Sequence, residues 1–146
     1  MDAFGSLLRS HLALTRSLNA QLVSDHGLTI NDYEVMLLLA RAPEQRLRRV
    51  DLAESVLLTA SGITRLLDGL EQAGYVDKAQ CDTDGRVTYA VLTEAGLEKL
   101  RAAGETHVAG IREVFETRFT EQELETLASL LARLPAEGDA GSCTVD

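Results

Sequence analysis

The change in hydrophobic period near residue 74 constrains the fold of this chain most. Before it, apolar residues recur at the i, i+3, i+4 and i+7 positions of one helix face, namely Ile63, Leu66, Leu67 and Leu70. After it, residues 75–80 and 87–92 have the period of strands, and Asp84-Gly85 between them is a strong hairpin signal. The sequence therefore predicts a helix over 60–73, stopped by Gly74, and then a β-hairpin.

A short apolar segment before this helix completes a helix-turn-helix. Leu52, Ala53 and Val56 predict a short helix over 51–57, and Thr59 is suited to cap the helix that follows. In such a pair, the second helix offers a polar face to the major groove of DNA and the first sets its angle. We therefore predict a mainly α fold with a winged helix-turn-helix, in which the hairpin is the wing.

The residues before position 51 predict two further helices. Residues 2–26 carry apolar side chains at helical spacing, and Gly27 follows as a stop. Asn31 with Glu34 three residues on has the spacing of a capping box. The stretch after this box is apolar nearly all round and ends before Pro43, so we expect a buried central helix.

The residues after the hairpin predict two more helices. Thr93 is suited to cap a long helix whose apolar positions continue to Phe119. Thr120 with Glu123 has the spacing of a second capping box. This box begins a last helix whose leucines continue to Leu134.

A chain of 146 residues suits one domain with its own core. We divide 1–146 into a winged helix-turn-helix lobe over 28–96, dimerisation helices over 1–27 and 97–135, and a flexible tail over 136–146. The terminal helices carry apolar stripes that a single chain of this size does not cover. These stripes predict a homodimer interface that contains Phe4, Leu7, Leu8, Leu124, Leu127 and Leu131.

The net charge of −9 argues against DNA binding, but its distribution removes the objection. Residues 41–90 carry seven basic and eight acidic side chains, whereas the rest of the chain carries seven basic and fifteen acidic ones. The acid therefore lies mostly in the flanks, where it weakens non-specific attraction to phosphates. Acidic helices are also ordinary solvated helices, so charge alone does not decide the function.

Composition also bears on the compartment. The sequence has no run of about 18 or more uncharged apolar residues, and its start lacks the pattern of a signal peptide. Cys81 and Cys143 make no disulfide framework and suit a reducing compartment. We therefore expect a cytoplasmic protein with no membrane partner.

The sequence offers no catalytic set, so we expect neither an enzyme nor a cofactor. It has no Gly-rich phosphate loop and no Gly-x-Ser-x-Gly turn, and its three histidines and two cysteines lack the spacing of a metal site. Asp82 and Asp84 lie close to Cys81 and favour its neutral thiol. A redox role for Cys81 is therefore the weaker interpretation.

Polar side chains lie opposite the apolar stripe of the predicted recognition helix. Ser61, Thr64 and Arg65 occupy its first two turns, and Gly62 between them allows a close approach to the DNA backbone. Arginine pairs with guanine, and serine and threonine serve as donors or contact a thymine methyl group. Arg86 beside the wing turn is suited to the narrow, electronegative minor groove.

Three segments together resemble the MarR family of bacterial transcription regulators. They are LTINDYEVMLLLARAP, VDLAESVLLTASGITRLLDGLEQAGYV and the wing DTDGRVTYAVLTEAG. The resemblance covers residues 20–100 well, and it implies that Asp84 orients arginines of the recognition face while Arg86 enters the minor groove. Val50 stands where the family has a capping Ser or Thr, and Gly85 replaces a basic wing residue, which implies fewer phosphate contacts. Arg48 and Arg49 are candidates to supply such contacts instead.

The candidate DNA contacts are Arg48, Arg49, Thr59, Ser61, Gly62, Thr64, Arg65, Asp84 and Arg86. The resemblance further implies a homodimer of interleaved terminal helices, a pseudopalindromic double-stranded operator, and a repressor that a small phenolic or aromatic acid releases. No ligand residue can be matched, and His11, expected on the buried side of the first helix, is the one weak candidate. The rival hypothesis is a winged-helix module that binds proteins and not DNA, because fold does not fix function.

Overall fold

The computed structural model describes residues 2–56, 58–81 and 83–134. It divides into two compact units, Met1–Gly110 and Ile111–Asp146, and the boundary falls within one long helix. The tail predicted over 136–146 lies outside the described residues, as does Leu57, the expected end of the short helix.

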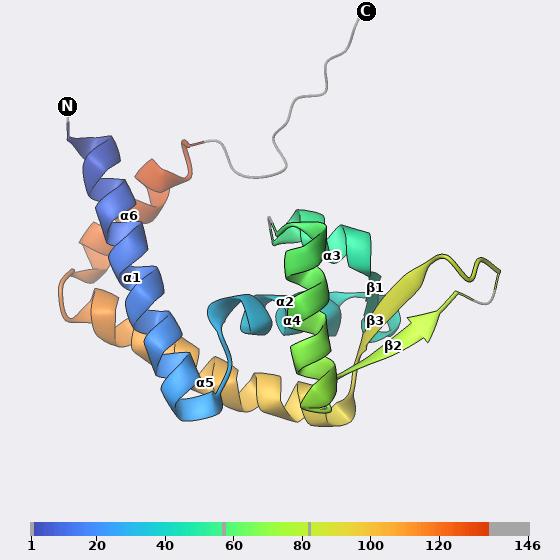
Figure 1. The fold of residues 1–146 in the computed structure, drawn as a ribbon. Coiled ribbons are helices and arrows are strands. Elements are labelled where there is room, and N and C mark those ends of the chain that lie inside the picture. Colours follow the sequence, from blue (N-terminus) through green and yellow to red (C-terminus); the bar gives the residue numbers. More distant parts are fainter. Residues whose placement is uncertain (1, 57, 82, 135–146) are drawn as a thin grey trace, which may run out of the picture. The chain divides into compact units, whose positions relative to one another are not determined.

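The first unit has the predicted mainly α architecture with a hairpin wing (Figure 1). The helix-turn-helix is α3 followed by α4, and the wing is β2 and β3, which extend away from the helices. In chain order the elements are α1 (Ala3–His26), α2 (Ile30–Arg41), the turn η1 (Pro43–Gln45), β1 (Arg46–Arg48), α3 (Arg49–Ser55), α4 (Ala60–Gln72), β2 (Val76–Gln80), β3 (Thr88–Leu92) and α5 (Glu94–Glu116).

Helix α4 forms as the sequence predicts. The Thr59 hydroxyl caps it and accepts a hydrogen bond from the Gly62 amide at 3.1 Å. Ile63, Leu67 and Leu70 are buried along one face, against the rest of the helical core. The helix stops at Gly74, whose φ of 78° lies in the left-handed region that glycine adopts without strain.

The wing is part of a three-stranded sheet with the order β1-β3-β2. The β2 and β3 strands pair antiparallel, with Val76 opposite Leu92 and Gln80 opposite Thr88. The β1 strand, which the sequence did not predict, pairs with the other edge of β3 and places Arg48 opposite Tyr89. The sheet therefore fixes the base of the wing on both edges of β3.

A threonine joins the base of the wing to both flanking helices. The Thr93 hydroxyl donates to the Gly74 carbonyl at 2.7 Å and accepts from the Gly96 amide at 3.0 Å. The Thr93 amide also donates to the Tyr75 carbonyl. Residue 93 therefore caps α5, as predicted, and it closes the hairpin against the end of α4.

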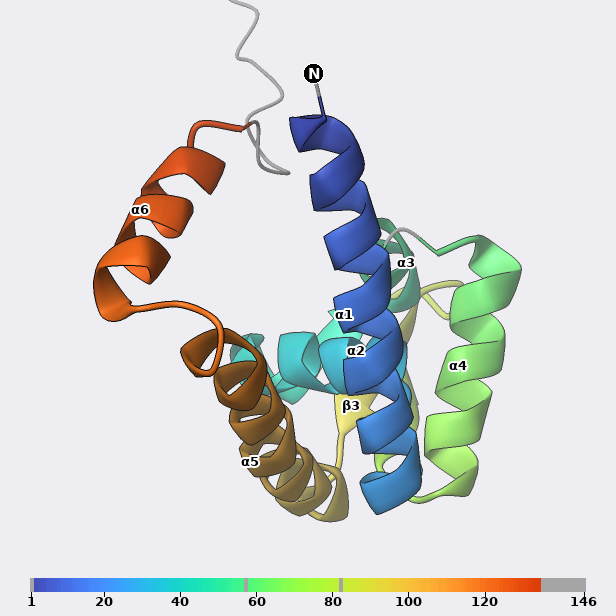
Figure 2. The ribbon, with the colours of Figure 1, turned by 90° about the vertical axis from the view of Figure 1, so that its left-hand side faces the viewer.

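The central helix α2 is buried as predicted, but its start was predicted wrongly. Val35, Met36 and Leu39 are fully buried, and Figure 2 shows α2 at the centre of this unit with α4 on its flank. The capping box lies two residues earlier than the Asn31–Glu34 spacing suggested. The Thr29 hydroxyl accepts from the Asp32 amide, and the Asp32 carboxylate accepts from the Thr29 amide at 2.8 Å.

The start of α3 also differs from the prediction. The helix begins at Arg49 with Arg48 as its N-cap, and no side chain caps it. Val50, which we expected at the cap position, lies inside the first turn and is 60% exposed. Asp51 in this turn accepts two hydrogen bonds from the Arg48 guanidinium, both at 2.8 Å, which organises the helix start without a conventional cap.

Helix α1 joins the first unit through its C-terminal half. Leu22 is fully buried, and the Asn19 side chain accepts from the Ile30 amide at the start of α2. His26 Nε2 lies 2.7 Å from the Thr106 hydroxyl of α5. His11 is exposed on the single chain, so the expectation that it lies on a buried side is wrong there. No helix within the described residues is long and apolar enough to cross a membrane.

The second unit holds the end of α5 and helix α6 (Glu121–Leu131). The predicted capping box is present, with Thr120 as the N-cap. The Glu123 carboxylate accepts a hydrogen bond from the Thr120 amide. The helices on either side of this box are both shorter than predicted: α5 ends before Phe119, and α6 ends before Leu134. No described residue of α6 is buried, so its apolar stripe is open in the single chain.

Candidate nucleic-acid interface

The outer face of α4 carries the predicted recognition residues near its N-terminus. Ser61 and Arg65 are exposed, and Thr64 is half-buried at the edge that faces α3. The Thr59 hydroxyl, which caps the helix, also lies 3.2 Å from the Ser61 hydroxyl. A donor-rich helix start is therefore open to solvent, as an insertion into a major groove requires.

The local packing at Gly62 restricts the room for a side chain, apart from any approach of DNA. A Cβ atom there would lie 3.2 Å from the Thr59 hydroxyl and 3.6 Å from the Leu58 side chain. The missing side chain therefore leaves room for the capping hydroxyl under the helix start. This space lies toward Leu58 and the Thr59 hydroxyl, and the predicted phosphate approach stays a prediction.

The wing tip presents Arg86 on a tight turn. The Asp84 carboxylate accepts from the Arg86 amide at 3.0 Å, and the Val87 amide donates to the Asp84 carbonyl. Asp84 thus shapes the turn that carries Arg86. Its predicted action on arginines of the recognition face is not among the described contacts.

Some basic side chains of the lobe already have acidic partners. Arg48 pairs with Asp51 in a two-bond contact, which raises the pKa of Arg48 through the hydrogen bonds and charge of that carboxylate. Arg46 pairs with Glu44 and stacks over the Tyr89 ring. Two of the seven basic side chains of the lobe are therefore already paired with carboxylates, which weakens their attraction to phosphate.

Lys78 forms a clasp between the wing and α4 that the sequence reasoning missed. Its ammonium group lies 2.6 Å from the Glu71 carboxylate and 2.9 Å from that of Asp68. Hydrogen bonds to Glu71 and then Asp68 raise the pKa of Lys78. The three groups are half-exposed, so the clasp contributes modestly to stability but orients β2 against α4.

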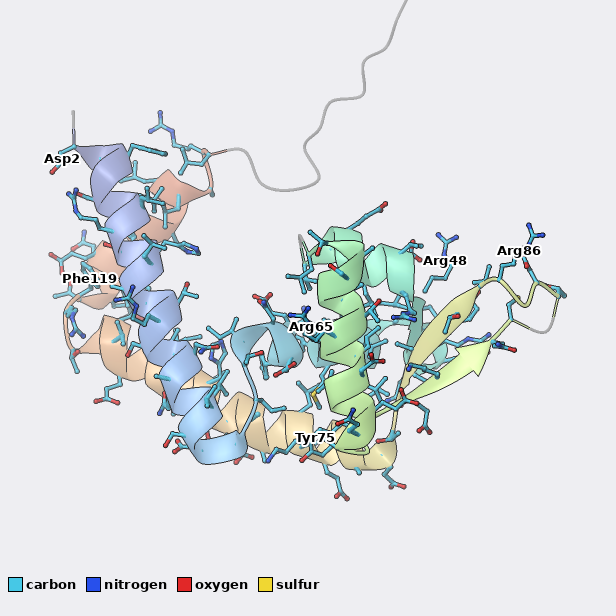
Figure 3. All side chains as sticks on the ribbon, viewed as in Figure 1. Asp2, Arg48, Arg65, Tyr75, Arg86 and Phe119 are labelled. Carbon is cyan, nitrogen blue, oxygen red and sulfur yellow. The ribbon has the colours of Figure 1, made fainter. Side chains whose placement is uncertain are left out.

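Arg65 and Arg86 remain without an ion pair to any side chain that the structure describes. Both are exposed. Figure 3 shows Arg86 extending from the tip of the wing, Arg48 beside α3, and Arg65 on α4. The unshared positive charge of the lobe therefore includes one arginine on the recognition helix and one on the wing.

Cys81 lies at the end of β2 in an environment that differs from the expectation. The Thr83 hydroxyl lies 3.2 Å from its sulfur, and hydrogen bonds from Thr83 and the Asp84 backbone lower the pKa of Cys81. The Asp84 charge acts in the opposite direction, as expected, but it is the smaller effect. The predicted effect of the Asp84 charge is therefore present, but the expectation that it decides the state of the thiol is wrong, because the hydrogen bonds lower the pKa of Cys81.

A second polar cluster lies between α2 and α5. The rings of Tyr33 and His107 are 5.0 Å apart, and Gly104 leaves the space beside the Tyr33 hydroxyl open. His107 Nδ1 is buried and has no hydrogen-bond partner among the described residues. No periodic or motif signal in the sequence predicts this pairing, because it depends on how two helices cross.

Comparison with known proteins decides the family. Residues 26–87 match the family model described as "MarR family". The chain is 30% identical over 134 residues to the HTH-type transcriptional regulator MhqR of Bacillus subtilis. The matched region covers 92% of this chain and 90% of that protein. The chain belongs to the MarR family. It is thus a DNA-binding transcription regulator with a winged helix-turn-helix, and its relatives in this comparison are regulators rather than enzymes.

Solved structures of MarR-family regulators have the same fold. AbsC of Streptomyces coelicolor is 34% identical with a TM-score of 0.73, and the match covers 90% of each chain. Sco3205 of the same organism, solved in complex with DNA, is 29% identical with a TM-score of 0.78 over 94% of this chain and 90% of that one. The helix-turn-helix and wing of this MarR-family chain therefore belong to an architecture that is known on DNA.

Proposed function

We propose that this chain binds a specific double-stranded operator as a homodimer, with α4 in the major groove and the wing in the adjacent minor groove. The observation that carries the proposal is a pair of exposed arginines, Arg65 on α4 and Arg86 on the wing, that form no ion pair with the described side chains. Arginine supplies bidentate contacts to guanine in the major groove and suits a narrow minor groove. Exposed cations on both elements favour a polyanionic partner over the rival hypothesis of a module that binds only proteins.

The proposal is tested by single substitutions at these arginines. Arg65→Ala should relax base preference and cost about 1–3 kcal/mol of binding to an operator selected from random DNA. Arg86→Ala should weaken binding more evenly across sequences. Arg46→Ala, which removes a cation already paired with Glu44, is the matched control and should change affinity by less than either. If both test variants bind the operator as tightly as the parent protein at the same salt, the proposal is wrong.

The dimer part of the proposal rests on uncovered apolar surface in both terminal helices. Phe4 is 69% exposed and Leu8 is 47% exposed on α1, and Leu131 is 41% exposed on α6. Burial of the part that is still exposed is favourable by about 25 cal/mol for each Å² of apolar surface removed from water. A two-fold dimer would place two copies of α4 on half-sites about one helical turn apart.

We further propose that the protein represses by occupying its operator and that a small phenolic or aromatic acid releases it. His107 Nδ1 supports this part, because it is buried with no partner among the residues that the structure describes, and such an atom is costly until a ligand or water satisfies it. A screen of small aromatic acids for release of operator DNA tests it. His107→Phe should remove the response while DNA binding persists, and an unchanged response in that variant counts against this site.

A further inference from the structure

The geometry points to a division of labour between Arg49 and Thr64. We propose that Thr64 discriminates a thymine through its methyl group and that Arg49 is a positioning residue rather than a phosphate contact. The inference rests on the proposed function, because it assumes that α4 enters the major groove.

The Thr64 hydroxyl is occupied inside the protein. Its single hydrogen is donated to the Ala60 carbonyl one turn earlier, at 2.8 Å. A hydroxyl has one hydrogen and two lone pairs, so Thr64 has no proton left for a base acceptor. One of its lone pairs accepts a hydrogen bond from the Arg49 guanidinium at 2.6 Å.

The Arg49 contact holds this arrangement from outside the helix. Arg49 begins α3, and its bond to Thr64 is partly buried and joins residues 15 positions apart. A charged donor makes this hydrogen bond stronger than a neutral one. It therefore opposes rotation of the threonine side chain and fixes the edge of α4 against α3.

The hydroxyl can then offer a base at most one acceptor lone pair, whereas the methyl group is not engaged in either of these bonds. A threonine methyl contacts the 5-methyl group of thymine in the major groove, which cytosine lacks. The neighbours Ser61 and Arg65 are more exposed, and no hydrogen bond joins either side chain to α3 among the described residues. Thr64 is thus the apolar element of an otherwise polar recognition face.

Replacement of thymine by uracil removes only the 5-methyl group and tests this contact directly. The full-length protein first selects its operator from random DNA, and each thymine pair of the two half-sites is then replaced by uracil. Fluorescence anisotropy at fixed salt measures the affinity of each probe. For the parent protein we expect one symmetric position where uracil weakens binding by about fourfold per half-site, the effect of exposing one buried methyl group.

Two variants at Thr64 separate the methyl group from the hydroxyl. Thr64→Val keeps the methyl but loses the bond from Arg49, so it should retain part of the uracil penalty, whereas Thr64→Ser keeps the hydroxyl and should bind both probes equally. A penalty that is retained by the serine variant and lost by the valine variant overturns the proposal, as does a parent protein that tolerates uracil at every position. If the parent protein selects no sequence at all, the proposed function fails instead.

Salt dependence separates the two roles of Arg49. Arg49→Met should reduce the uracil penalty but leave the slope of log affinity against log salt unchanged, because no phosphate contact is lost. A phosphate ligand would lower that slope by about 0.9 per subunit, and such a change overturns the positioning role. Arg49→Lys, which keeps a charged donor, should restore part of the uracil penalty. Circular dichroism melting confirms that each variant is folded.

Discussion

At the scale of single residues, hydrogen bonds and ion pairs hold the helix ends and several charged side chains of the lobe in place. Thr93 bonds to the Gly74 carbonyl and the Gly96 amide, and Arg48 is held by Asp51. The Thr93 bonds satisfy polar groups at two helix ends, and the Arg48 contact pairs a cation with a carboxylate. Arg65 and Arg86, which have no ion pair among the described side chains, are therefore the informative ones.

Gly96 is a residue where the backbone approach forbids a side chain. A Cβ atom there would collide with the Tyr75 carbonyl oxygen and the Leu92 side chain. Gly96→Ala should lower the free energy of unfolding by about 1–3 kcal/mol, measured by urea denaturation. Gly69→Ala is the control, because nothing lies near its Cβ position, and it should stabilise α4 by roughly 0.5–1 kcal/mol. Equal effects of the two substitutions would contradict this account.

Cys81 should react faster than an ordinary thiol. Hydrogen bonds from Thr83 and the Asp84 backbone lower its pKa, and the thiolate is the reactive form. In a Cys143→Ser background, iodoacetamide alkylation measured against pH should therefore have its midpoint below that of a free cysteine. Thr83→Val removes the first of these hydrogen bonds and should move the midpoint upward. A midpoint that does not respond to Thr83→Val would show that the Thr83 hydroxyl is not the cause.

At the scale of elements, the capping box of α6 makes that helix sensitive to acid. The backbone and hydroxyl of Thr120 donate to Glu123 and lower the pKa of Glu123. A carboxylate with a depressed folded-state pKa stabilises above its unfolded-state pKa, and this contribution is lost as pH falls through the folded-state value. The helicity difference between the parent protein and Glu123→Gln should thus be present at neutral pH.

The same difference should vanish in acid, at pH values below the ordinary glutamate range near 4.3. Circular dichroism at 222 nm against pH measures it. Glu125→Gln, which changes a glutamate of α6 that takes no part in the capping box, is the matched control and should show no such dependence. A difference that persists unchanged into strong acid would contradict the assigned cause.

Elements with a strong local pattern were predictable from the sequence, and those that depend on distant partners were not. The stripe of α4 and the hairpin turn are local, and both were predicted with bounds within one or two residues. The β1 strand is three residues long and pairs with β3 more than 40 positions away, so no period reveals it.

Side-chain contacts across the lobe follow the same rule. The capping box of α2 was misplaced because Thr29–Asp32 and Asn31–Glu34 have the same spacing, and local sequence does not choose between them. The Arg49–Thr64 bond and the Lys78 clasp depend on the angles between elements. The candidate DNA contacts were therefore predictable from the sequence, but the hydrogen bonds and ion pairs that some of them form within the protein were not.

At the scale of the whole molecule, the proposed function depends on a second copy of the chain. Leu127→Glu places a charge in the apolar stripe of α6 and should convert a dimer to a monomer, measured by sedimentation velocity. Operator affinity should fall with it, because two linked half-sites bind far more tightly than one. Ser129→Glu, on the other side of the same helix, should keep the dimer. A dimer that survives Leu127→Glu would place the interface elsewhere.

The closure of the wing at Thr93 makes the hairpin an exchangeable part. Residues 75 and 93 are bonded at its base, so the strands between them return to the point from which they leave. Changes of length or sequence at the tip need not disturb either flanking helix. In evolution and in protein engineering alike, such a chain can acquire a new minor-groove preference by replacing one loop while the rest of its fold is inherited intact.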